Sequence, residues 1–94
     1  MTLRVRFADD ISVTCRYLLR KELVRAVDQL TAGTDVNILV DEDISSKCAF
    51  ISVYRGQRLS SVAEDSVIRS LIIGIPEIMS TDSLKCVRSI EVME

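Results

Sequence analysis

The stretch RYLLRKELVRAV, residues 16–27, constrains the fold of this 94-residue chain more than any other feature. It has helical character on both sides, contains neither glycine nor proline, and places Arg16, Arg20 and Lys21 close together. A tight turn near 19–22 would give two helices after the first strand, whereas an unbroken segment would give one helix from about 12 to 31. The two outcomes predict different folds.

Strands are indicated in four places. Leu3, Val5 and Phe7 alternate with Arg4 and Arg6, which is the period of a half-buried strand. The segments DVNILV (35–40) and CAFISVY (48–54) are rich in strand-forming residues, and the polar loop DEDISSK (41–47) between them predicts an antiparallel hairpin. A last strand is expected over 84–93, with one face formed by Leu84, Cys86, Ile90 and Val92.

Helices are expected in two regions. In the first, residues 12–19 follow a capping Asp10 or Ser12, and a helical apolar pattern continues from Leu23 to a stop at Gly33. In the second, the capping box Ser61-x-x-Glu64 precedes a wide apolar stripe, which Pro76 is expected to end or kink. The stripe contains Val67, Ile68, Leu71, Ile72 and Ile75.

Together these elements predict one α+β domain over residues 1–94. Its two layers are an antiparallel sheet of three to four strands and helices packed on one face of that sheet. An unbroken first helix gives the order β-α-β-β-α-β, the ferredoxin-like plan. A break near 19–22 gives β-α-α-β-β-α followed by a terminal strand.

The second order is that of a type I KH domain, and several stretches resemble that family. LRVRFA is similar to the first KH strand, LTAGTDVNILVDED to the junction after the second helix, and CAFISVYRGQRLSSVAEDSVIRSLI to the third strand and long helix. The resemblance covers residues 3 to about 75. In KH domains a Gly-x-x-Gly loop brings the backbone against phosphates of single-stranded nucleic acid. Here Leu18-Leu19-Arg20-Lys21 stands in its place, without glycine.

Domains of this glycine-free kind occur in Bicaudal-C-like multi-KH proteins. The resemblance therefore implies a protein-binding or spacing role in an RNA-associated assembly. Arg16, Arg20, Lys21 and Arg25 are the candidate contacts to RNA or to an acidic partner, since the N-terminal third is basic although the net charge of the chain is −2.

Chemical motifs point away from catalysis. The chain has no histidine, the usual general base near neutral pH, and no Gly-rich phosphate loop, nucleophile elbow or ligand-spaced cysteine cluster. Adjacent carboxylates at Asp41, Glu42 and Asp43 lack the spacing of a calcium loop, so they are interpreted as solvated. We expect no enzymatic activity, no cofactor, no metal and no small-molecule substrate. Phe50 is expected to pack in the core rather than to stack on bases.

Composition bears on partners and location. Hydrophobic residues make up 48% of the chain and the mean hydropathy is +0.25, which favours sharing apolar surface with a protein partner or in a homodimer. Cys15, Cys48 and Cys86 predict buried, reduced thiols in a cytoplasmic protein. The N-terminus does not resemble a signal peptide, and LIIGI is too short to span a membrane.

These observations lead to one expected function with two alternatives. The expected function is a non-catalytic KH-like interaction module that associates through an apolar helix surface or an edge strand. The first alternative is weak, direct binding of single-stranded RNA by the basic N-terminal third. The second is a dimeric ferredoxin-like adaptor unrelated to RNA. The strand over 84–93 either completes its own sheet or pairs with another chain.

Overall fold

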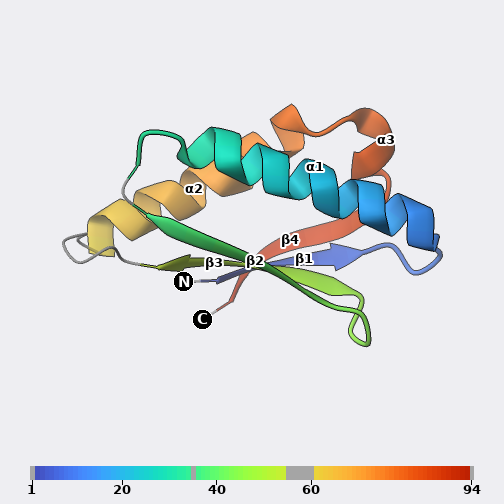
Figure 1. Cartoon of the computed structure of the whole chain (residues 1–94). Helices are drawn as coiled ribbons and strands as arrows, with labels where there is room; N and C mark the ends of the chain where they lie inside the picture. The colour runs from blue at the N-terminus through green and yellow to red at the C-terminus, as the bar shows by residue number, and fades with distance from the viewer. Residues whose placement is uncertain (1, 35, 55–60, 94) are drawn as a thin grey trace.

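The computed structural model describes residues 2–34, 36–54 and 61–93, with the backbone alone for 61–64. Four antiparallel strands form one sheet in the order β2-β3-β1-β4, and both long helices lie on the same face of it (Figure 1). The predicted two-layer α+β class is confirmed. The elements are β1 (Thr2–Phe7), α1 (Val13–Thr31), β2 (Asn37–Asp43), β3 (Cys48–Tyr54), α2 (Ser61–Ile78), α3 (Thr81–Leu84) and β4 (Val87–Met93).

The first helix is continuous, so the predicted break near 19–22 was wrong. The Ser12 hydroxyl caps α1 by accepting the backbone N–H of Cys15 at 3.1 Å, and Gly33 adopts a φ of 80° just beyond the helix end. Leu19 and Leu23 are both fully buried and lie four residues apart, on one face of an unbroken helix. The element order is therefore the ferredoxin-like alternative, with the short α3 added before β4.

The core lies between the sheet and the two helices. It contains the alternate residues of β1, together with the inward faces of β3, α1 and α2. Phe50 does not belong to it, and this expectation was wrong. In β3 it is Ala49, Ile51 and Val53 that face the helices, so the period of two places Phe50 on the opposite face, where it is half-buried.

Two boundaries differ from expectation at the hairpin and the last strand. β2 continues through Asp43, which shortens the loop to residues 44–47. Leu84 ends the short helix α3 instead of entering the last strand, which begins at Val87. β4 pairs with β1 from Thr2↔Met93 to Phe7↔Val87, so it completes its own sheet as an edge strand.

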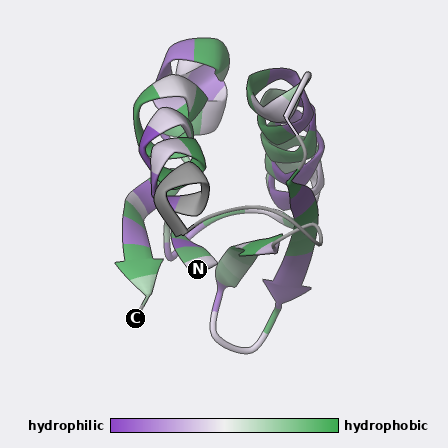
Figure 2. Cartoon of the chain, turned by 90° about the vertical axis from the view of Figure 1, so that its left-hand side faces the viewer, coloured by the Kyte–Doolittle hydropathy of each residue, from purple (hydrophilic) through white to green (hydrophobic). Residues whose placement is uncertain are grey.

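The helices pack closely at one glycine. Figure 2 shows α1 and α2 side by side above the sheet. A Cβ on Gly74 of α2 would overlap Cδ2 of Leu30 on α1, so the absence of a side chain permits this approach. Pro76 lies inside α2, which continues for two residues beyond it and ends at Ile78. The predicted capping side chains at Ser61 and Glu64 lie outside the described side chains.

The cysteines are free thiols, but they are not all buried as expected. Cys48 is buried, Cys86 is partly buried and Cys15 is exposed, because burial along α1 begins only at Leu19. Within 2–34, 36–54 and 61–93, no helix is long and apolar enough to cross a membrane.

Candidate functional site

The structure divides the four predicted basic residues into two pairs. Arg16 and Arg20 lie on the side of α1 that faces β2. Glu42 of β2 holds both of them, with its carboxylate oxygens 3.1 Å from Nε of Arg16 and 3.7 Å from Nη1 of Arg20. The Glu42 side chain is 13% exposed, so this carboxylate pairs with both arginines and offsets one of their two positive charges. Arg16 and Arg20 are therefore less available to a partner than their sequence positions suggest.

The other pair, Lys21 and Arg25, lies one helical turn apart on the side of α1 that faces α2 and α3. Both side chains are exposed, and neither has an ion-pair partner in the described part of the chain. Unpaired cations at this spacing present two positive charges along one line of the helix.

Three adjoining hollows follow the line where α1 meets α2 and α3. The central one has a volume of about 320 Å³, and it shares lining residues with a hollow of about 300 Å³ toward Ile78 and a smaller one of about 90 Å³ toward Cys15. We call this surface the α1–α3 groove. Its lining comprises Cys15, Leu18, Lys21, Glu22, Arg25 and Gln29 from α1, and Ile78, Met79, Ser80, Asp82, Ser83 and Cys86 from the opposite wall.

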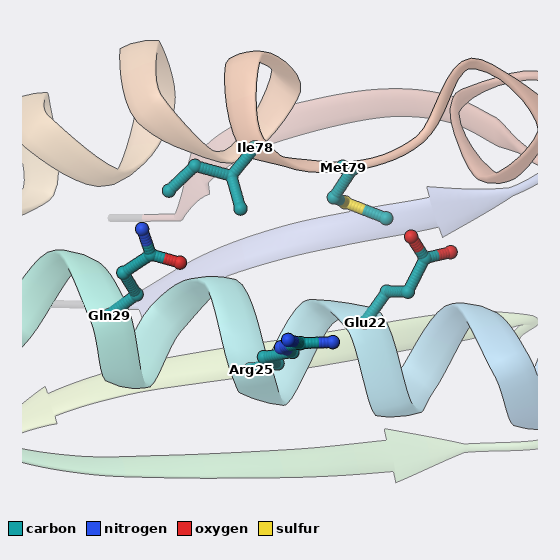
Figure 3. A pocket seen from close by; sticks show the side chains of 5 residues that line it. All are labelled: Glu22, Arg25, Gln29, Ile78 and Met79. Carbon is teal, nitrogen blue, oxygen red and sulfur yellow. The ribbon is translucent and has the colours of Figure 1, made fainter.

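Glu22 fixes the two walls of the groove together. Its carboxylate accepts the backbone N–H of Ser80 and the Ser80 hydroxyl, each at 3.2 Å. The Ser80 hydroxyl oxygen in turn accepts the backbone N–H of Ser83 and caps α3. Figure 3 shows Glu22 and Gln29 pointing from α1 toward the opposite wall, where Met79 and Ile78 lie. Because Glu22 is used in this way, its negative charge is engaged with the protein itself.

The remaining lining combines apolar and charged groups. Leu18 is 51% exposed and Ile78 is 37% exposed, and they stand on opposite walls. Asp82 in the first turn of α3 adds one negative charge where the central and the smaller hollow meet. Such a surface offers apolar contact and two cations, which suits binding of a segment that is itself part apolar and part acidic.

Other chemistry is sparse over the described residues. They hold no group of three or more histidine, cysteine, aspartate or glutamate side chains placed to bind a metal. Perturbed carboxyl groups lie outside the groove: the hydrogen bond from Arg4 lowers the pKa of Glu91, and the hydrogen bond from the Ser45 side chain lowers the pKa of Asp43. Both shifts come from local hydrogen bonding to the charged form.

Sequence reasoning found one wall of the groove and missed the other. Lys21 and Arg25 were candidates, but Ile78, Met79, Ser80 and Ser83 were not, because α3 was not predicted. A signal was present in Ser80-Thr81-Asp82-Ser83, where a serine N-cap and an acidic first turn are typical of a helix start.

Comparison with known proteins adds no relative. The chain matches no protein-family model, no curated protein and no solved structure.

Proposed function

We propose that this protein is a non-catalytic interaction module whose α1–α3 groove binds an acidic, partly apolar segment of a protein partner. The observation that carries the proposal is that Lys21 and Arg25 have no ion-pair partner among the described residues and lie on a groove with Leu18 and Ile78 on its two walls. A negatively charged segment would gain charge complementarity from Lys21 and Arg25. It would also bury apolar surface against Leu18 and Ile78.

A protein segment suits this groove better than RNA does for two reasons. Among the described residues no aromatic side chain lines the groove itself, and the exposed Tyr17 lies in a separate hollow with Arg20, Lys21 and Val24. Two of the four basic residues expected to touch phosphate, Arg16 and Arg20, are already held by Glu42. Single-stranded RNA is therefore the competing outcome of the experiment.

Fluorescence anisotropy tests the proposal directly. Labelled peptides of about 15 residues, with acidic and leucine residues at helical spacing, are titrated with the protein at low and moderate salt, beside labelled oligo-uridine of similar charge. We expect the peptide to bind more tightly than the RNA. The double variant Lys21→Glu with Arg25→Glu should weaken peptide binding at least tenfold.

A matched control separates the groove from net charge. Arg69→Glu with Lys85→Glu changes the charge by the same amount at exposed positions that do not line the groove. We expect this control to bind nearly as well as the parent protein. Equal losses in the two double variants, or tighter binding of RNA than of every acidic peptide, would contradict the proposal.

A further inference from the structure

A second surface with organised charge lies on the face of the sheet away from the helices. In the described part of the chain this face carries no helix (Figure 1), and we call it the open sheet face. Each strand contributes alternate side chains to it. They are Asn37, Leu39, Asp41 and Asp43 from β2, Cys48, Phe50, Ser52 and Tyr54 from β3, Thr2, Arg4 and Arg6 from β1, and Ser89, Glu91 and Met93 from β4.

The strand register arranges these charges in columns. Asp41 is the partner of Phe50, and Phe50 is the partner of Arg4 on its other side. One row along, Cys48 stands in the same way between Asp43 and Arg6. The open sheet face therefore has an acidic column on β2 and a basic column on β1, separated by the neutral column of β3.

Neither column is fully neutralised by the residues that the structure describes. Among these, Glu91 pairs with both arginines, with oxygens 2.6 Å from Nη2 of Arg4 and 3.4 Å from Nε of Arg6, so one positive charge is left over. No cation pairs with Asp41 or Asp43 in the described residues, where these carboxylates accept backbone and serine hydrogen bonds.

We infer that the open sheet face is the interface of a symmetric homodimer. The two-fold axis lies between the two facing sheets and runs parallel to β3. Rotation about this axis places β3 over β3 of the second copy and β2 over β1. Asp41 and Asp43 of each copy then face Arg4 and Arg6 of the other, and the two Phe50 rings meet near the axis. A surface of this kind is complementary to itself, as an isologous contact requires.

A two-fold axis perpendicular to the strands would also lie in the plane of the interface, but the charge columns favour the axis parallel to β3. An axis perpendicular to the strands would place β2 over β2 and β1 over β1, which sets aspartates against aspartates and arginines against arginines. Like charges at that distance are repulsive. The small rotation usual between packed sheets, about 30°, leaves the columns facing each other.

The size of the face sets the expected strength. The axis over β3 leaves β4 without a facing strand, so the three overlapping strands of about seven residues cover roughly 14 by 23 Å. This is less than the roughly 800 Å² per partner that a typical stable interface buries. We therefore expect a dimer that dissociates in the micromolar range. The inference concerns a different surface from the α1–α3 groove and does not depend on the proposed function.

A charge exchange tests the inference by sedimentation equilibrium between about 1 and several hundred micromolar, the range that a weak interface of this size implies. One variant carries Asp41→Arg with Asp43→Arg, and the other carries Arg4→Asp with Arg6→Asp. Each alone should self-associate at least tenfold more weakly than the parent. An equal mixture should restore a dimer, because opposite columns again face each other. A parent that is monomeric throughout, or variants that dimerise like the parent, would overturn the inference.

A cross-linking experiment tests the same interface if either of the two double variants does not fold. Phe50→Cys, in a Cys15→Ser background, is treated with a short bismaleimide reagent. We expect a covalent dimer, since facing sheets about 10 Å apart are within reach of the reagent. The control is Ile73→Cys in the same background, because Ile73 is 64% exposed on α2, away from the sheet. Equal cross-linking of the two variants would refute the proposed interface.

Discussion

The carboxylate of Glu22 on α1 accepts both the backbone N–H and the hydroxyl of Ser80, and so joins α1 to the start of α3. Glu22→Ala removes both hydrogen bonds and should lower the free energy of unfolding by about 1 kcal/mol. Glu22→Gln retains one acceptor oxygen and should cost about half as much. Urea denaturation measures both, and Gln29→Ala is the control, because Gln29 lines the same groove without a hydrogen bond of this kind. Equal effects in the alanine variants would show that the contact adds no stability.

The approach of α1 to α2 at Gly74 leads to a second prediction. Gly74→Ala gains helix propensity worth about 1 kcal/mol, but its methyl group must displace the flexible end of the Leu30 side chain, which costs toward the lower end of the about 1–3 kcal/mol of overpacking. We expect the two effects nearly to cancel, so that the free energy of unfolding changes by less than about 1 kcal/mol.

A double-mutant cycle with Leu30→Ala isolates this steric cause. Truncating Leu30 makes room for the new methyl group, so the double variant should be more stable than the sum of the two single effects predicts. Strict additivity in urea denaturation would mean that the two side chains do not collide.

Glu42 controls how much of the basic surface of α1 is available. Glu42→Gln removes the carboxylate that holds Arg16 and Arg20, and should reduce stability by about 1 kcal/mol at most, since partly exposed ion pairs contribute little. It should also strengthen binding to heparin at low salt, because two cations are released. Asp28→Asn is the control, because it removes one charge from an exposed position of α1. Equal heparin retention by the two variants would contradict the prediction.

The Glu91 network predicts a dependence of stability on pH. The hydrogen bond from Arg4, then that from Ser89 and the charge of Arg6, lower the pKa of Glu91 below its usual value of 4.5. A lowered folded-state pKa means that the stabilisation is complete at neutral pH, begins to fall near pH 4.5 and is lost as pH drops through the lowered value.

The variant Glu91→Gln tests whether stability falls in this direction as the pH is lowered. The variant should be less stable than the parent at pH 7, and the difference should shrink as the pH is lowered past 4.5. Urea midpoints at pH 7 and at about pH 3 measure it. Glu77→Gln, at an exposed position of α2, should show no such convergence. A constant difference between Glu91→Gln and the parent at both pH values would refute the prediction.

Local patterns in the sequence predicted the elements well where one period dominates. β3 was expected over 48–54 and is Cys48–Tyr54, because a polar loop precedes it and strand-forming residues fill it. The break expected in α1 came from resemblance to another fold. The apolar spacing from Leu19 to Leu23 already continues across Arg20 and Lys21 with the period of one helix.

The candidate site was predictable only on one side. Lys21 and Arg25 stand out as a basic pair, but the partner of Arg16 is Glu42 on a different element, and no local pattern reveals such a contact. The opposite wall of the groove depends on how α2 packs on α1, which in turn depends on the close contact of Gly74 with Leu30. Contacts of this kind follow from tertiary packing rather than from local sequence.

The acidic end of β2 affects how readily copies of this protein aggregate. β2 is an edge strand, and unpaired edges invite other chains to add strands until insoluble aggregates form. Asp41 and Asp43 place two negative charges on the open sheet face at that edge, whereas Glu42 on the other face is paired with Arg16 and Arg20. A β2 strand of another molecule that adds here in parallel meets its own charges, so this end of the strand acts as a gatekeeper that favours solubility at high concentration.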